Sequence, residues 1–204
     1  MVLLKLDPND LKTKAGSGKI IFTRKNIEKL DEFPKGPLIE LIQGDIYLVP
    51  SPTPLHQEIS ANLNFAIKKY LVSHPVQSQP GKLYYAPIDL ILSEENLVIP
   101  DLVFIKKSNE SIIKEKAIEG IPNLVIEILS TNREHDLHYK KDLYESFGIQ
   151  EYWIVDPVSK SIEIFNYSKE DLKYLPARVF KSKDAIISKV LYNFTLNVDD
   201  IFPE

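Results

Sequence analysis

Residues 97–105 read LVIPDLVFI, and residues 124–129 read LVIEIL. Each stretch is a short apolar run of the kind that forms a buried central strand of a sheet. Each also contains one acidic residue, Asp101 in the first run and Glu127 in the second. A lone carboxylate is costly to bury unless it is paired or bound to a metal ion. The two runs therefore predict a sheet in which Asp101 and Glu127 are buried for a shared reason.

The flanking segments predict the other elements of the fold. Thr53 and Pro54 are suited to begin a helix, and a second helix is expected over residues 136–147. Two short helices are expected at residues 27–33 and 111–117. Further strands are expected at residues 38–42 and 46–49, which form a hairpin, and at residues 83–92, 151–155, 161–167, 174–180 and 185–190.

The order of these elements predicts an α/β fold of the α+β type, with an αβββαβ core, a mixed sheet, an N-terminal β-hairpin and a C-terminal β extension. The stretch before residue 21 is rich in turn-forming residues, so we expect residues 1–20 to be a flexible leader. Residues 21–204 then form a single domain, for which 204 residues are an ordinary length.

The composition narrows the function. A net charge of −4 disfavours a protein that coats nucleic acid nonspecifically, so any DNA contact must be local. The absence of cysteine excludes disulfides, zinc–thiolate sites and a cysteine nucleophile, so a metal ion would have oxygen or imidazole ligands. No apolar run is long enough to span a membrane and the start lacks a signal-peptide core, so we expect a cytoplasmic protein.

Lys140 is predicted to face inward from the second helix. At 3.6 residues per turn, Lys140 shares a face with Leu143 and Tyr144, whereas Lys141 lies about 100° away. A buried ammonium group needs acidic partners, which Asp101 and Glu127 could supply. Two interpretations stay open. The three residues form a structural salt bridge, or the two acids hold a divalent cation while Lys140 orients or activates a water molecule.

The chain resembles the Uma-type family of predicted restriction-endonuclease-like proteins, within the PD-(D/E)xK nuclease superfamily. The resemblance covers about residues 20–160, and the end of the chain, residues 194–202, also resembles the usual ending. The matching segments are residues 39–45, 51–56, 86–90, 99–104, 122–130, 136–144 and 148–157. Any one segment is weak evidence, whereas the ordered set is specific.

The resemblance implies a metal-dependent phosphodiesterase in which Asp101 and Glu127 bind Mg²⁺ or Mn²⁺. The sequence departs from the superfamily pattern at Leu129, where the motif has lysine. In the resembled family that lysine has moved to the following helix, which matches the inward position of Lys140. A homodimer that acts on two DNA strands is the further expectation from the resemblance.

Three other polar residues lie in matching segments. Taken alone, Glu40 fits a solvated or ion-paired strand residue, and His56 fits a hydrogen-bonding or packing residue at a helix start. The resemblance implies instead that Glu40 would complete the metal shell and that His56 would bind phosphate or transfer a proton. Asp89 would lie behind the ligands. By contrast, Tyr152 and Trp153 fit core packing better than base stacking, because they lie in an apolar strand. His135 and His138 lack a third ligand nearby in the sequence, so we expect them to be exposed.

The sequence thus predicts a Mg²⁺-dependent endonuclease that hydrolyses DNA phosphodiester bonds, with Asp101, Glu127, Lys140, Glu40 and His56 as site residues. The alternative is a catalytically inactive binding or interaction module. It would keep the nuclease fold and use Asp101, Glu127 and Lys140 as a structural salt-bridge cluster.

Overall fold

The computed structural model describes residues 12–13, 20–28, 38–73, 81–130 and 135–203. Seven strands form the central sheet, in the order β13-β12-β11-β10-β8-β5 with β14 beside β12. Their bounds are β5 Lys82–Tyr85, β8 Leu102–Ile105, β10 Leu124–Ile128, β11 Glu151–Asp156, β12 Ser161–Ser168, β13 Lys173–Tyr174 and β14 Arg178–Phe180. Strands β10 and β11 are parallel, whereas β10 is antiparallel to β8 and β11 is antiparallel to β12. The sheet is therefore mixed, as predicted.

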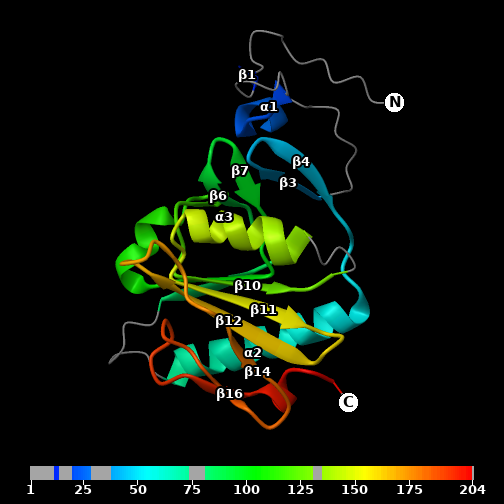
Figure 1. The fold of residues 1–204 in the computed structure, drawn as a ribbon, viewed down its shortest axis with the longest axis vertical. Coiled ribbons are helices and arrows are strands. Elements are labelled where there is room, and N and C mark those ends of the chain that lie inside the picture. The colour runs from blue at the N-terminus through cyan, green and yellow to red at the C-terminus, as the bar shows by residue number, and fades with distance from the viewer. Residues whose placement is uncertain (1–11, 14–19, 29–37, 74–80, 131–134, 204) are drawn as a thin grey trace.

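Two helical segments cover opposite faces of this sheet (Figure 1). Helix α2, Pro54–Ser73, packs on one face, and helix α3, Lys141–Ser146, packs on the other. The π-helical segment η3, His135–Lys140, directly precedes α3 in the chain. The Thr53 hydroxyl accepts a hydrogen bond from the backbone N–H of His56 at 3.2 Å, which caps α2 as predicted. In chain order, α2, β5, β8, β10, α3 and β11 form the predicted αβββαβ core.

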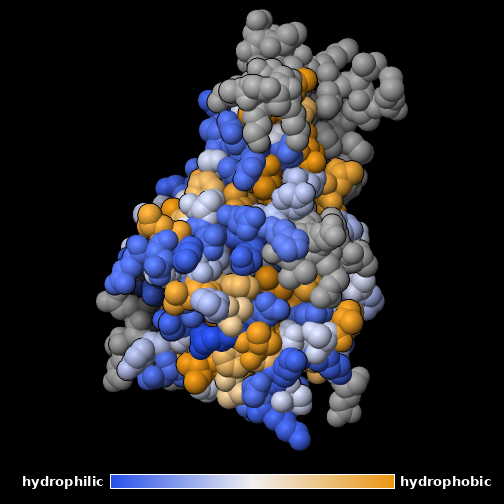
Figure 2. Space-filling view, viewed as in Figure 1, coloured by the Kyte–Doolittle hydropathy of each residue, from blue (hydrophilic) through white to orange (hydrophobic). Residues whose placement is uncertain are grey.

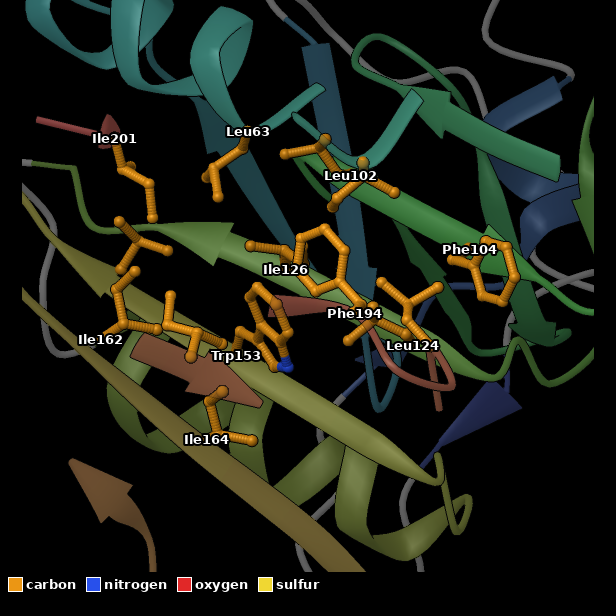
Figure 3. Packing of buried hydrophobic residues seen from close by; sticks show 14 of the residues in the cluster. Leu63, Leu102, Phe104, Leu124, Ile126, Trp153, Ile162, Ile164, Phe194 and Ile201 are labelled. Atoms are coloured by element: carbon orange, nitrogen blue, oxygen red, sulfur yellow. The ribbon is translucent and has the colours of Figure 1, made fainter. Parts of the chain in front are cut away.

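Each face of the sheet has its own hydrophobic core. In β10, Ile126 belongs to the core under α2, whereas Val125 belongs to the core under α3. Figure 3 shows part of the first core, in which residues of the central strands meet α2 and the C-terminal segment. Its labelled members are Leu63, Leu102, Phe104, Leu124, Ile126, Trp153, Ile162, Ile164, Phe194 and Ile201. Because strand side chains alternate, Glu127 points toward α3 together with Val125.

A second, five-stranded sheet lies beside α3 in the order β4-β3-β7-β6-β9 (Figure 1). Its strands are β3 Leu38–Ile42, β4 Asp45–Val49, β6 Leu90–Ser93, β7 Asn96–Val98 and β9 Ile118–Glu119. The predicted hairpin is confirmed as β3 and β4. This sheet contributes Glu40, in the middle of β3, to the face that meets α3.

Two predicted long strands are each divided between the two sheets. Residues 83–92 form β5 in the central sheet and β6 in the second sheet, with Pro87 between them. Residues 97–105 form β7 and β8 in the same way, with Pro100 at the break. Proline has no N–H to donate, so it ends the ladder of hydrogen bonds at both points. The predicted three-stranded unit therefore consists of β5, β8 and β10, and the β6–β7 hairpin is inserted between β5 and β8 in the chain.

The short helices are shifted from their predicted positions. Instead of a helix over residues 111–117, a 3₁₀-helix, η2, spans Lys107–Ile112, because Ile113 pairs with Ile118 in a β-bridge. Helix α1 spans Arg24–Glu28, beginning before the predicted residue 27, because Thr23 accepts a hydrogen bond from the N–H of Asn26. The rest of the prediction, residues 29–33, lies outside the described residues.

The ends of the chain add small paired strands. In the predicted leader, β1 (Lys12–Thr13) pairs with β2 (Ile20–Ile21), and the other leader residues lie outside the described part. The predicted strand 174–180 is divided into β13 and β14. The last predicted strand, residues 185–190, is shorter than expected, since β15 spans only Ala185–Ile187. Strand β15 pairs with β16 (Thr195–Asn197), and the 3₁₀-helix η4 (Val198–Asp200) follows β16.

The surface on one side of the molecule is drawn in Figure 2. Apolar residues form separate patches among polar ones on this face. Within the described ranges, no helix is long and apolar enough to cross a membrane.

Candidate functional site

Lys140 lies between two buried glutamates. Its Nζ is 2.8 Å from Oε1 of Glu40 and 3.1 Å from Oε1 of Glu127. The exposed fraction of the Lys140 side chain is 5%, and that of each glutamate side chain is 3%. The inward position that helical spacing predicted for Lys140 is confirmed, and so is its contact with Glu127. Its second acidic partner is Glu40 and not Asp101.

The fold orients Glu40 from two sides. Strand β3 carries Glu40 toward Lys140, and the backbone N–H of Ile99 donates a hydrogen bond to Oε1 of Glu40 at 2.9 Å. Ile99 directly precedes Pro100, in the segment that leads from the second sheet to the central sheet. The link between the two sheets therefore holds Glu40 in place.

Tyr144 is a site residue that the sequence analysis did not identify. Its hydroxyl donates a hydrogen bond to Oε1 of Glu127 at 2.6 Å, and its side chain is fully buried. Burial raises the pKa of the Tyr144 hydroxyl well above its ordinary value, and the nearby charges of Glu127 and then Glu40 raise it further. The signal was present in the sequence, because Tyr144 lies one helical turn after Lys140 on the same face.

The raised pKa of Tyr144 predicts a specific loss of stability in alkali. Below the unfolded-state pKa of about 10, Tyr144 is neutral in both states and its stabilising contacts are fully present. As the pH rises above that value, the unfolded chain loses the proton first, and the folded state loses up to about 1.4 kcal/mol of stability per pH unit. We expect Tyr144→Phe to lose less stability than the wild type in urea unfolding between about pH 8 and pH 10.5.

Tyr192→Phe is the matched control for this titration, because Tyr192 is 70% exposed. It should keep the wild-type dependence on pH. Equal losses in the wild type and Tyr144→Phe would contradict a neutral, buried Tyr144.

Asp101 and His56 form a second pair beside the first cluster. Nε2 of His56 lies 3.2 Å from Oδ2 of Asp101, and the exposed fractions of these side chains are 11% and 14%. The same Oδ2 accepts a hydrogen bond from the backbone N–H of Ile128 at 2.7 Å. Because Ile128 follows Glu127 in β10, this bond joins the two pairs along one strand. The first turn of α2 supplies His56, and the residue before β8 supplies Asp101.

One cavity of about 440 Å³ collects all five predicted site residues. Its lining includes Glu40, His56, Asp101, Glu127 and Lys140, which come from β3, α2, the start of β8, β10 and η3. The apolar part of the lining includes Tyr47, Leu48, Val49, Pro50, Leu55, Pro87, Pro157 and Val158. Residues from distant parts of the sequence therefore meet at one solvent-accessible point.

Other polar candidates lie elsewhere. Asp89 is exposed and is not part of the described cavity lining. Tyr152 and Trp153 are fully buried, each in one of the two cores, which confirms core packing. His138 is exposed, as expected, whereas the side chain of His135 lies outside the described part of the chain.

The three acids named as metal ligands do not form one preassembled shell. Glu40 faces Lys140, and in the described ranges no three His, Cys, Asp or Glu side chains are grouped so that they could hold a metal ion. Asp101 and Glu127 nevertheless line the same cavity and are linked through Ile128. Mg²⁺ in proteins is commonly held by one or two carboxylates together with water molecules. The donor set therefore fits a two-carboxylate magnesium site.

Comparisons with known proteins agree with the fold and the motifs. A crystal structure described as a "putative nuclease belonging to DUF820 from Anabaena variabilis ATCC 29413" matches with a TM-score of 0.70 and 19% sequence identity. The match covers 89% of this chain and 97% of that chain. No curated protein matches the chain. Residues 25–199 match the family Uma2, described as "Putative restriction endonuclease", and the chain therefore belongs to that family.

Proposed function

We propose that the protein is a Mg²⁺-dependent endonuclease that hydrolyses DNA phosphodiester bonds. The observation that carries this proposal is the meeting of Glu40, His56, Asp101, Glu127 and Lys140 at one cavity. Family membership and the nuclease-like fold support a nuclease in the coarser sense.

Asp101 and Glu127 are the residues that would hold the metal ion. Bound there, Mg²⁺ or Mn²⁺ would polarise the phosphoryl group and lower the pKa of a water molecule. The protein contributes two carboxylates that are fixed before the ion arrives. Asp101 is fixed by the Ile128 N–H, and Glu127 is fixed by the Tyr144 hydroxyl.

His56 is suited to move a proton at the site. In hydrolysis, a water oxygen gives up a proton as it bonds to phosphorus, the bond to the leaving oxygen of the strand breaks, and that oxygen takes up a proton. Imidazole titrates near neutral pH, and Asp101 lies close enough to orient the His56 ring. We therefore assign proton transfer to His56.

Lys140 and Glu40 are positioning residues in this proposal. The ammonium group of Lys140 contacts the Glu127 carboxylate and holds it at the cavity. Glu40 holds Lys140 from the opposite side. Because Lys140 lines the cavity, its charge would stabilise negative charge that develops on phosphoryl oxygens bound there.

A second candidate is the binding module without catalysis. One observation favours it, namely that the charged residues satisfy one another. Lys140 pairs with Glu40 and Glu127, and His56 pairs with Asp101. Such a self-contained cluster is able to stabilise the fold without a metal ion.

Cleavage of supercoiled plasmid DNA with Mg²⁺ or Mn²⁺ tests the proposal. We expect Asp101→Asn to reduce the rate by at least about 100-fold, because it weakens the metal site and removes the charge that orients His56. Asp200→Asn changes an exposed acid outside the described cavity lining and is the matched control. It should cleave at the wild-type rate.

Equal cleavage by the wild type and Asp101→Asn would overturn the endonuclease assignment. A folded wild-type protein that cleaves no nucleic acid with either metal would favour the binding module.

A homodimer is the remaining part of the proposal. Two copies related by a two-fold axis would bring two cavities to two DNA strands. Light scattering coupled to size-exclusion chromatography should give about twice the chain mass of 23.4 kDa. A single-chain mass at micromolar concentration would contradict it.

A further inference from the structure

The walls of the cavity are apolar although its floor is charged. Val158 is 85% exposed, Leu48 is 62% exposed and Leu55 is 43% exposed, and all three belong to the lining. Exposed apolar side chains that gather around a polar site commonly mark a binding surface. The ligand of this cavity should therefore have an apolar part as well as a part that meets the charged floor.

Tyr47 gives the wall an aromatic surface next to the floor. In the β3–β4 hairpin, Tyr47 is the direct cross-strand partner of Glu40, so the two side chains point to the same side of the sheet. Its ring packs against the ring of Tyr139, with 6.0 Å between the centroids. Both Tyr47 and Glu40 line the cavity. An aromatic ring in this place offers a stacking surface to a flat group held above the charged residues.

Within the part of the cavity lining that the structure describes, the backbone of a duplex would meet one cation. Among the described lining residues, Lys140 is the single lysine or arginine, and it already contacts Glu40 and Glu127. Duplex DNA presents a dense row of phosphates that proteins bind with several lysines or arginines. If a duplex lay against the apolar rim, its phosphates would lose bound water and gain no polar contact in exchange.

We propose that the cavity receives one unpaired nucleotide of a single-stranded nucleic acid. Its base lies against the part of the wall that Tyr47 and Val158 contribute, and its phosphodiester faces His56. This inference rests on the proposed phosphodiester chemistry and defines the substrate class of that site. The substrate is then a single strand, a strand end or a locally unpaired base, which presents a free face for stacking.

Binding of labelled ten-nucleotide strands tests the inference without cleavage. Fluorescence anisotropy is measured in EDTA and again with Ca²⁺, using oligothymidine, oligouridine, a hairpin duplex and an abasic strand that keeps the phosphates. We expect a single strand to bind at least about tenfold more tightly than the duplex, and the abasic strand to lose most of that affinity. The thymidine and uridine arms distinguish DNA from RNA.

Substitutions in the wall make the test specific. Tyr47→Leu should weaken binding of the single strand by about tenfold, whereas Tyr47→Phe keeps the ring and should bind like the wild type. Val158→Ser should also weaken binding and carries little risk to folding, because position 158 is largely exposed. Val72→Ser is its matched control, since Val72 is 78% exposed and lies outside the described cavity lining.

The outcomes separate this inference from the proposed function. Plasmid cleavage that depends on Asp101, together with equal binding of duplex and single strand, would overturn the inference and leave the endonuclease. Single-strand binding that depends on Tyr47 and Val158, with no cleavage of that single strand in Mg²⁺ or Mn²⁺, would support the binding site and overturn the endonuclease. Failure of all four probes to bind, or unchanged binding by Tyr47→Leu, would overturn the inference.

Discussion

Replacing Lys140 with alanine is expected to lower the free energy of unfolding by about 3–5 kcal/mol, the range for removing one partner of a buried ion pair. The reason is that Glu40 and Glu127 would remain almost fully buried without the ammonium group that contacts both. Urea unfolding at neutral pH, followed by circular dichroism, measures the change.

Lys141→Ala is the control for this prediction. Lys141 is the next residue, is half-buried, and places its ammonium group 5.3 Å from the centre of the Phe165 ring. Loss of that cation–π contact should cost only about 0.5–1 kcal/mol. A large difference between the two alanine variants would therefore come from the glutamates.

The charge balance of the cluster gives a sharper test. In the wild type, one lysine faces two glutamates, so the double variant Lys140→Ala, Glu40→Gln restores the original net charge of the cluster. We expect the double variant to be more stable than Lys140→Ala alone. The change in unfolding free energy of the double variant would then differ from the sum of the two single changes. If Lys140→Ala costs no more than Lys141→Ala, the ion pairs contribute little to the fold.

The sequence predicts the core of the fold because that core depends on local patterns. Apolar runs indicated β8 and β10, and helical spacing indicated α2 and the inward face of Lys140. The division of the long runs between two sheets was not predicted, although Pro87 and Pro100 mark both breaks. A proline shows where a ladder ends, but it does not show which sheet the next strand joins.

The members of the site and the contact between Lys140 and Glu127 were predictable, whereas the other two pairs were not. All five candidates line one cavity, yet Lys140 pairs with Glu40 and Asp101 pairs with His56. The pair of Lys140 and Glu40 depends on how the second sheet packs beside α3, and the pair of Asp101 and His56 depends on how α2 packs on the central sheet. Both are long-range arrangements without a local signal. By contrast, the contact between Tyr144 and Glu127 follows from the face that Tyr144 shares with Lys140.

A third buried glutamate, Glu151, was not predicted from the sequence. It begins the apolar strand β11, its side chain is 0% exposed, and it lies with Trp153 on the side of the α2 core. It accepts four hydrogen bonds, of 2.6–2.8 Å each. The donors are Trp153 Nε1, Asn166 Nδ2, the Ser188 hydroxyl and the backbone N–H of Lys189. Two donors come from the C-terminal segment, so Glu151 fastens that segment to the central sheet.

Glu151→Ala is therefore expected to lower the free energy of unfolding by about 3–5 kcal/mol, because it leaves several buried donors without an acceptor at about 1–3 kcal/mol each. Glu151→Gln should lower the free energy of unfolding by less than Glu151→Ala. The amide keeps one oxygen that accepts hydrogen bonds, although its NH₂ group faces the donors of the other oxygen. Glu163→Ala is the control, because Glu163 lies on the neighbouring strand β12 and is half-buried. Urea unfolding of the three variants measures the order of their free energies of unfolding.

A double-mutant cycle with Ser188→Ala shows whether Glu151 acts through the C-terminal segment. Ser188 donates to Glu151 and also accepts hydrogen bonds from the backbone N–H groups of Val190 and Leu191. If the carboxylate fastens this segment, Ser188→Ala should cost less in the Glu151→Ala background than in the wild type, because its link to the sheet is already lost. Hydrogen exchange should then show faster exchange at residues 185–191 in Glu151→Ala but not in Glu163→Ala. Additive costs with unchanged exchange would mean that the C-terminal segment is held by its apolar contacts with Trp153 and the rest of the core, and not by Glu151.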